Sequence, residues 1–434
     1  LWTGLTVSDL GNAVTFVALP LVAVLALRAS AFEVGLISAA SSVAWLVIAL
    51  PAGVWVDRAR RRYVMIGADL ARAVLMASIP VAWWLGALTV AQLVVVSLLV
   101  GVGTVLFVIA DTAFMPHVLP RDRLHDGNGA LQASMNASNI AGPGLAGFLV
   151  QLVGAPATLL VDAVSFLVSA GTVGAMRTRE ERPPRPAERP RLLAEVRDGL
   201  RYVFRNPLPR TLAVGIGLCN LVFGGYDTVA ILFLARQLHL SAGAVGVLFG
   251  VGPVGGLLGS MAAGRLARRF GDGRITVAAT VVMVLGGLLL PFTRAGLGLT
   301  WFVAGSVILS AAIGVFNVCV VSAMQSTTPP NLLGRVSAST RMFTRGSIPL
   351  GALFGGGLAT WFAPRWALTI TMLLLLPMPL VFRFSPLGRV RTVAELAPPD
   401  LPAQLAPPPA GTGPAGDAPA TGAGEPRDGA QVRR

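Results

Sequence analysis

A series of long apolar runs, separated by short charged or Pro/Gly-rich breaks, constrains this chain more than any other feature. A helix that crosses the hydrocarbon core of a bilayer needs about 20 mostly apolar residues. Hydrophobic residues make up 54% of the 434 residues and charged residues only 12%, which excludes an ordinary soluble globular protein. The runs predict an all-α polytopic membrane protein with twelve spans, at residues 1–27, 33–55, 64–86, 89–113, 128–153, 157–176, 210–234, 242–264, 274–293, 297–324, 336–361 and 365–383.

Arginines are gathered in alternate loops between the predicted spans. The net charge of +14 alone would suit a nucleic-acid partner, but basic residues in every second loop indicate membrane topology instead. Arginine-rich loops stay on the cytoplasmic side, so we expect both termini and the long central loop there, with the bilayer as partner and no nucleic acid. All 34 basic residues are arginines, which indicates a GC-rich genome and a multi-pass protein of the bacterial inner membrane.

Breaks in hydropathy divide the chain into four parts. Residues 1–176 are predicted to form an N-terminal six-helix bundle and residues 210–384 a C-terminal one. Residues 177–209 join them as a cytoplasmic loop with an amphipathic helix. Residues 385–434, rich in Pro, Ala and Gly, are expected to be a disordered cytoplasmic tail. The start inside an apolar run without a methionine predicts that a short leader precedes the chain.

The helix expected in the central loop has an apolar stripe and an arginine face. Leu192, Val196, Leu200 and Val203 recur at helical spacing. This pattern predicts a helix that lies on an anionic leaflet. A solvated connector helix is the alternative.

The two halves carry an internal repeat with an offset of about 210 residues. Gly53 and Arg58 match Gly264 and Arg269, and each pair follows the second span of its half. Two pseudo-symmetric six-helix bundles joined by a long loop are typical of carriers whose halves rock about a central site.

The loop after the second span combines a glycine, an aspartate and several arginines: Gly53, Asp57, Arg58, Arg61 and Arg62. We expect Gly53 to let two helices approach closely, and Asp57 to accept hydrogen bonds at the start of a neighbouring helix. The loop resembles the signature loop of the major facilitator superfamily. In that family, the resemblance implies, the aspartate holds the two halves together on the cytoplasmic side.

The other gating residues follow from the repeat and from the neighbouring span. The loop in the second half keeps Gly264 and Arg269 but has Arg268 where the aspartate would stand, so the latch is expected in the first half alone. Asp111, near the end of the fourth span, is a candidate partner for Arg58 or Arg61.

A glycine-proline stretch in the fifth span, Gly142-Pro143-Gly144 with Gly147, resembles a motif of antiporters in this superfamily. Proline frees a backbone carbonyl and glycines allow close packing; ordinary small-residue packing is the alternative. Residues 119–136 and 334–355 resemble the branch of twelve-helix drug:proton antiporters that includes macrolide and enterobactin exporters. Glycines at 246, 250, 255 and 259, and at 351 and 355, predict close helix packing.

Ionisable residues within spans are costly and are functional candidates. Asp69 and Arg72 lie three residues apart on one helix and are expected to pair. Asp9 lies one turn from Asn12 in the first span, and Asp227 is expected to hold the corresponding place in the second half. These residues are the candidate substrate or proton sites, with polar contacts between helices as the alternative. Asp162 is also within a span.

The absence of lysine excludes a phosphate-binding loop and hence an ATP-driven pump. The three histidines and two cysteines have no metal-ligand spacing. We therefore expect no enzyme, no metal and no cofactor, but a monomeric exporter that exchanges protons for a small amphiphilic solute, such as a drug, a macrolide or a siderophore-like compound. The alternatives are a proton-coupled symporter that imports a nutrient, and a non-transporting membrane sensor on the same scaffold.

Overall fold

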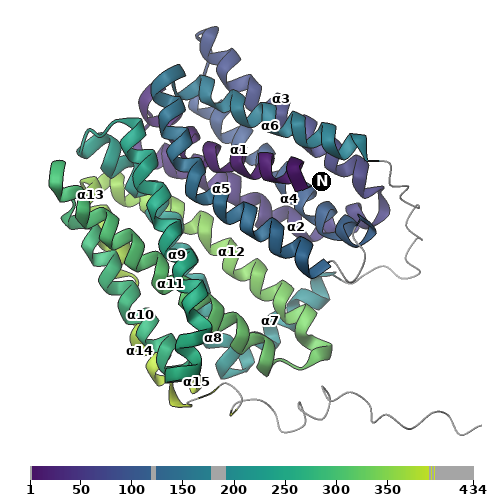
Figure 1. The fold of residues 1–434 in the computed structure, drawn as a ribbon, viewed down its shortest axis with the longest axis vertical. Coiled ribbons are helices and arrows are strands. Elements are labelled where there is room, and N and C mark those ends of the chain that lie inside the picture. The colour runs from purple at the N-terminus through teal and green to yellow at the C-terminus, as the bar shows by residue number, and fades with distance from the viewer. Residues whose placement is uncertain (1, 119–123, 177–191, 391, 393–394, 396–434) are drawn as a thin grey trace, which may run out of the picture. The chain divides into compact units, whose positions relative to one another are not determined.

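The computed structural model describes residues 2–118, 124–176, 192–390, 392 and 395, and this part of the chain folds into helices without a strand (Figure 1). The helices of the first half are α1 (Trp2–Leu21) with the π-helix η1 (Val22–Ala26), α2 (Ala31–Arg58), α3 (Arg61–Trp84), α4 (Val90–Val118), α5 (Leu124–Val153) and α6 (Ala155–Ala175). After α7 (Leu192–Arg205) come α8 (Pro207–Leu232) with the π-helix η3 (Phe233–Gln237), α9 (Ala242–Phe270), α10 (Asp272–Leu289), α11 (Leu299–Thr327), α12 (Pro330–Trp361), α13 (Pro364–Leu373), α14 (Pro377–Phe384) and α15 (Pro386–Arg389).

The twelve predicted spans each correspond to helices of the structure. The last span consists of α13 and α14, and a turn before Pro377 interrupts it. By length and composition alone, ten helical segments of the described residues are apolar enough to cross a membrane. The spans that fall short are α5 and α12, which carry more polar residues because they contact the opposite half of the protein.

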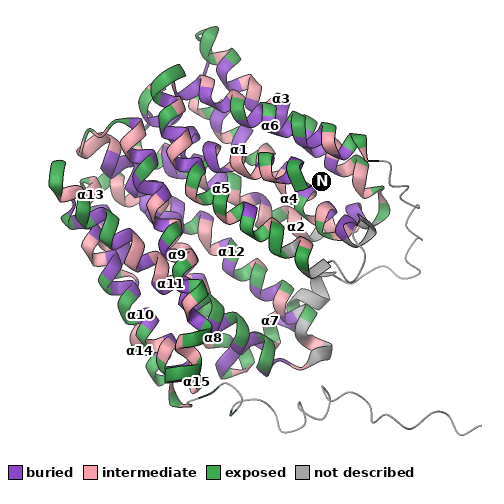
Figure 2. Cartoon of the chain, viewed as in Figure 1, coloured by how far each residue is buried: buried purple, intermediate pink, exposed green. Residues whose placement is uncertain are grey.

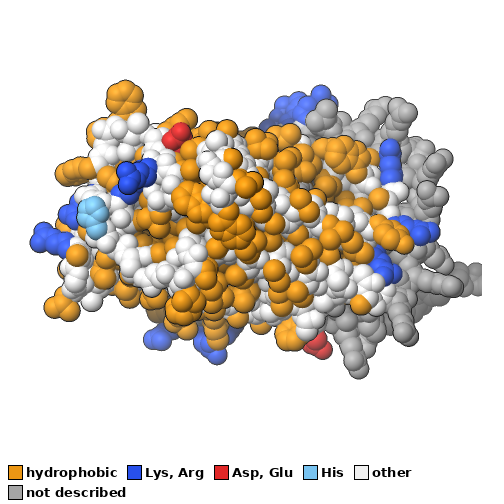
Figure 3. Space-filling view, turned by 90° about the horizontal axis from the view of Figure 1, so that it is seen from above, with side chains coloured by type: hydrophobic (Ala, Val, Ile, Leu, Met, Phe, Trp, Pro, Cys, Tyr) orange, Lys and Arg blue, Asp and Glu red, His pale blue; other side chains and the backbone are white. Residues whose placement is uncertain are grey.

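Each half packs as a bundle, and two helix pairs join the halves. Within the halves, α1 and α3 pack against α6, α2 against α4, α8 against α12, and α9 against α11. Across the halves, α5 packs along α9 and α2 packs along α12. Buried residues line the inner faces of these helices (Figure 2). Hydrophobic side chains cover the middle of the surface shown in Figure 3 and arginines lie toward its margins, as a bilayer requires.

Glycines hold both pairs of joining helices close together at one end. A side chain at Gly246 of α9 would meet the carbonyl oxygen of Pro143 and, at 3.0 Å, the Cα of Gly147 in α5. Likewise, a Cβ at Gly356 of α12 would lie 3.0 Å from the Cα of Gly35 in α2. This end lies opposite the arginine-rich loops, because α2 and α9 begin there and α5 and α12 end there.

At the arginine-rich end the same four helices do not meet closely. A Cβ on Gly53 of α2, Gly129 of α5 or Gly334 of α12 would have no heavy atom within 4 Å, and Gly264 of α9 faces only Arg268 of its own helix. The close helix approach expected at Gly53 is therefore absent from this structure. The halves are joined at one end and separated at the other.

The other predicted glycine contacts are mostly confirmed. Gly250, Gly255, Gly259, Gly351 and Gly355 each face the backbone of a neighbouring helix, so a side chain there would collide. In the glycine-proline stretch, Gly142 faces Ala13 of α1 and Gly147 faces Ala242 of α9, but Gly144 faces open space.

The internal repeat is visible in unusual backbone geometry. The π-helices start at Val22 and Phe233, which are 211 residues apart, and each leads to a residue of positive φ, Arg28 and His239. The helices that follow are capped by Ser30 and Ser241 at the same spacing. With this register Asp227 corresponds to Phe16 and not to Asp9, so the expected equivalence of Asp9 and Asp227 is wrong by about two helical turns.

The central-loop helix is docked on protein. A helix forms at Leu192–Arg205, as the apolar spacing predicts. It packs against α12 and α8, with Val203 buried and the Phe204 ring 5.4 Å from that of Phe343. Part of the stripe that we assigned to a lipid leaflet therefore faces protein. The tail predicted to be disordered begins too early, since α15 lies within it; residues from 396 on lie outside the described part.

We predict that Gly246→Ala destabilises the protein by about 1–3 kcal/mol, because an added methyl group overpacks the contact between α5 and α9. The control is Gly144→Ala on α5, where the same methyl group meets open space. The measurement is the midpoint of thermal unfolding in detergent. Equal midpoints for the two variants would show that the close contact is not needed.

Candidate functional site

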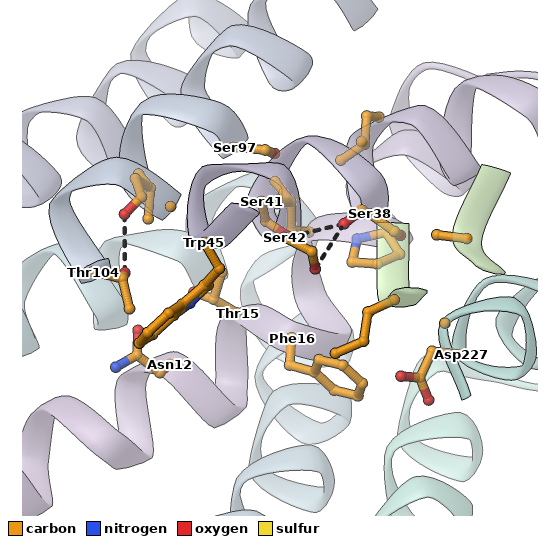
Figure 4. A pocket seen from close by; sticks show the side chains of 18 of the residues that line it. Asn12, Thr15, Phe16, Ser38, Ser41, Ser42, Trp45, Ser97, Thr104 and Asp227 are labelled. Atoms are coloured by element: carbon orange, nitrogen blue, oxygen red, sulfur yellow. Dashed lines mark hydrogen bonds between the residues drawn. The ribbon is translucent and has the colours of Figure 1, made fainter. Parts of the chain in front are cut away.

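A cavity of about 330 Å³ lies between the two halves, near the middle of the bundle (Figure 4). Most of its wall comes from α1, α2 and α4 of the first half, and α8 and α12 of the second half close it. The polar and aromatic residues of the wall are Asn12, Thr15, Phe16, Ser38, Ser41, Ser42, Trp45, Ser97, Thr104, Asp227 and Arg345.

The wall combines aromatic surfaces with hydroxyl groups. Phe16 and Trp45 present rings to the space, as Figure 4 shows. The hydroxyls of Ser41 and Ser42 donate to the carbonyl of Ser38 at 2.9 and 3.5 Å, so they are satisfied within α2. The buried Ser97 hydroxyl has no hydrogen-bond partner among the described residues, and it is open to a ligand. Such a wall suits a solute with both apolar and polar parts.

Two charged side chains reach the cavity from the second half. Asp227 projects from α8 and is partly buried. Arg345 projects from α12, and its guanidinium carbon lies 4.9 Å from the centre of the Trp45 ring of α2, a cation–π contact that crosses between the halves. Sequence reasoning missed Arg345, although its position inside the predicted span at 336–361 was a usable signal.

A second cavity, of about 300 Å³, lies within the first half and contains three of the predicted acidic and basic residues. Asp9, Asp111 and Arg72 line it together with Asn12, so Asp9 and Asn12 share one face of α1 as expected. Asp111 was expected to pair with Arg58 or Arg61, but one oxygen of its buried carboxylate has no partner among the described residues. The pairing is absent because Asp111 faces the inside of the bundle.

The predicted pair of Asp69 and Arg72 is confirmed as a buried salt bridge within α3. The Arg72 guanidinium lies between the Phe107 and Phe166 rings, 4.7 and 4.2 Å from their centres. One of its nitrogens also lies 3.4 Å from the Thr104 hydroxyl. Ring contacts on both sides compensate for part of the hydration that the buried cation loses.

Asp162 is the acidic residue that the sequence analysis noted without assigning a role. It lies in α6 and is fully buried. The hydroxyls of Thr15 and Ser165 contact its carboxyl oxygens at 2.5 and 3.0 Å. Its partner from α1 is 147 residues away in sequence, so no local pattern could have indicated the contact.

The loop after α2 contacts its own half of the protein. Arg62 donates to the carbonyls of Val173 and Gly174 at the end of α6, and Arg58 is exposed. The side chain of Asp57, the predicted latch, lies outside the described residues. In the second-half loop, Arg269 stacks on Phe270, 5.2 Å from the ring centre.

Asn220, two turns before Asp227, makes a packing contact. Its amide donates to the carbonyl of Thr344 in α12 at 2.9 Å. No group of three or more His, Cys, Asp or Glu side chains in the described part of the chain could hold a metal ion.

Comparison with known proteins assigns the family. The model of the Major Facilitator Superfamily matches residues 1–351. The chain is 28% identical to the multidrug efflux pump Tap of Mycolicibacterium fortuitum over 384 residues, which is 84% of this chain and 90% of that protein.

Solved structures share the fold at low sequence identity. A bacterial homologue of the iron transporter ferroportin in its inward-facing state has a TM-score of 0.72 at 15% identity, over 88% of this chain and 96% of that one. The same homologue in its outward-facing state has a TM-score of 0.55 at 16% identity, over 88% and 97%. The family model covers most of the chain, and the chain therefore belongs to the major facilitator superfamily and is a membrane transporter, not an enzyme.

Proposed function

We propose that this protein exports a small amphiphilic solute from the bacterial cytoplasm in exchange for protons, by alternating access. The observation that carries the proposal is the cavity between the halves, whose walls come from both bundles. A site shared by two bundles changes shape when they move relative to each other, which is what alternating access needs.

The lining of the cavity supports an amphiphilic substrate. Phe16 and Trp45 offer apolar surface, the hydroxyls of Ser97 and Thr104 offer hydrogen bonds, and Asp227 offers a negative charge. The similarity to a multidrug efflux pump supports a drug-like solute, and a macrolide or a siderophore-like compound fits the same chemistry. Arg345 opposes Asp227 in charge, so we expect a substrate with separated polar groups.

The direction of opening supports loading from the cytoplasm. The halves are separated at the arginine-rich end, and the positive-inside rule places that end, both termini and the central loop in the cytoplasm. The higher TM-score with an inward-facing structure than with an outward-facing one agrees with this state. An exporter takes up its solute in this state. We propose the two bundles at 1–176 and 210–384 as the moving bodies, in a monomer.

Two other functions remain candidates on the same scaffold. A symporter would bind a nutrient in the outward-open state, and a sensor would bind without transport. The glycine-proline stretch of α5 favours an antiporter: Gly147 packs against α9 where the halves meet, and a tightly packed joint prevents protons from leaking through the carrier.

We predict that cells producing the protein accumulate about tenfold less ethidium than cells without it, and that a protonophore removes the difference. Asp227→Asn is expected to slow efflux by about tenfold, because loss of one charge-assisted contact costs roughly 1.5–3 kcal/mol. The matched control is Asp126→Asn, which neutralises an exposed aspartate at the start of α5. Fluorescence of the loaded cells measures the rate.

Higher ethidium accumulation in producing cells would indicate import instead. An unchanged level for ethidium and for a panel of macrolides, with the protein present in the membrane, would indicate the sensor.

A second prediction concerns the loop after α2. We propose Asp57 as the latch of the outward-facing state, with Arg58, Arg61 and Arg62 as its charged neighbours. Asp57→Asn is expected to cut ethidium efflux severalfold and to leave the protein in the inward-open state, because an amide accepts helix N–H hydrogen bonds less strongly than a carboxylate. Arg60→Gln is the control in the same loop. Efflux at the wild-type rate, at equal expression, would rule out the latch.

A further inference from the structure

We infer that Asp162 is the carboxyl that carries the exchanged proton, that Thr15 connects it to the central cavity, and that Arg72 is its counter-charge when the proton leaves. This inference rests on the proposed proton antiport and specifies the residues that perform it. It differs from the hypothesis, made from the sequence alone, that Asp9 or Asp227 holds the proton.

The first argument is the balance of buried charge. Asp162 and Asp69 are both fully buried, and Arg72 is the basic residue that lies between them. Arg72 forms its salt bridge with Asp69. A second buried carboxylate without a cation costs several kcal/mol in a medium of low dielectric. The arrangement is therefore stable when Asp162 holds a proton.

The second argument is the hydrogen-bond network at Asp162. The Ser165 hydroxyl has one hydrogen, and it lies 2.8 Å from the Asp162 main-chain carbonyl and 3.0 Å from the carboxyl Oδ1. The Thr15 hydroxyl lies 2.5 Å from Oδ2. A protonated Asp162 uses each hydrogen once: Thr15 donates to Oδ2, Oδ1–H donates to Ser165, and Ser165 donates to the carbonyl. An ionised Asp162 would leave the Ser165 hydrogen shared between two acceptors.

The third argument is the connection to the central cavity. Asp162 contributes to neither of the two cavities, but Thr15 lines the central one and touches Asp162. Thr104 lines both cavities and contacts Arg72. A proton that leaves Asp162 passes to the Thr15 oxygen as Thr15 releases its own hydrogen to water in the cavity. Proton and substrate thus share a compartment, and they bind different side chains.

The fourth argument is the space around the cluster. Gly11 of α1 lies over Asp162, and a Cβ there would collide with the Asp162 and Ser165 side chains. Gly103 of α4 lies against the aliphatic part of Arg72, and a Cβ there would come within 2.8 Å of it. Both glycines leave the two functional side chains room. One carboxylate oxygen of Asp69 and the Nε of Arg72 lack partners in the described part of the chain, so the salt bridge is incomplete and free to rearrange.

These steps define a charge exchange. When Asp162 loses its proton, it becomes the second anion beside Arg72, and the guanidinium is drawn from Asp69 toward Asp162. The charged groups that face Asp162 are Asp69 and Arg72 on α3 and Asp9 on α1. On α5 the described acidic side chain is Asp126, which is exposed at the far end. Because α1 also lines the cavity, a shift of Arg72 changes the helix packing behind the substrate site.

Infrared spectroscopy of the purified full-length protein at neutral pH tests the protonation directly. A protonated carboxyl has a carbonyl stretch that a carboxylate lacks. We expect this band to lose intensity in Asp162→Asn and to be unchanged in Asp126→Asn. In heavy water, Thr15→Val should slow the isotope shift of the band and Thr15→Ser should restore it. An unchanged band in Asp162→Asn, or an equally fast shift in Thr15→Val, would overturn the inference.

Transport in proteoliposomes tests the role in coupling. With a pH gradient of about one unit, one-for-one exchange drives roughly a tenfold gradient of ethidium. We expect wild type to build this gradient, and Asp162→Asn to exchange ethidium across the membrane without building it. Should Asp162→Asn fail to fold, the comparison of Thr15→Val with Thr15→Ser decides, with coupled transport slowed in the first and restored in the second.

The outcomes separate the two proposals. Wild-type movement of ethidium that ignores the pH gradient overturns the antiport and this inference with it. Gradient-driven accumulation that persists in Asp162→Asn overturns the inference alone.

Discussion

The close backbone contact between α5 and α9, and between α2 and α12, sets the arrangement of everything else. Glycine at 147, 246, 35 and 356 lets these helices meet at the end remote from the arginine-rich loops. At the other end the same helices have glycines that face nothing. Two bundles that touch at one end enclose a space near the middle, and the cavity lies there. The cavity is thus a consequence of where the helices can approach each other.

Low dielectric is the second constraint, and it explains why charges are distributed unevenly between the halves. The first half contains Asp9, Asp69, Asp111 and Asp162 with Arg72 as their buried cation. Water can reach the acids that line a cavity, whereas Asp69 and Asp162 depend on protein partners. The second half places Asp227 and Arg345 at the wall of the central cavity, where a solute or water can solvate them. Buried proton chemistry therefore falls to the first half.

Local patterns allowed the fold to be predicted, while contacts between distant segments did not follow from them. Hydropathy predicts every span, because the bilayer acts on each helix separately. The pair of Asp69 and Arg72 was predictable since both lie on one helix face. The contact of Asp162 with Thr15 joins α6 to α1, and the direction of Asp111 depends on how α4 is rotated; both need the packed bundle. Arg345 was visible in the sequence, but a search centred on acids passed over it.

Separation of the proton site from the solute site has a physical advantage for a carrier with a broad substrate range. A carboxylate that binds both proton and solute makes coupling depend on the charge and size of each solute. In this chain, Thr15 lies between the cavity and Asp162, and Arg72 contacts the cavity wall through Thr104. The proton then acts on the position of Arg72 and on helix packing. Solutes of different shape can use the same coupling step, because that step involves residues which they do not touch.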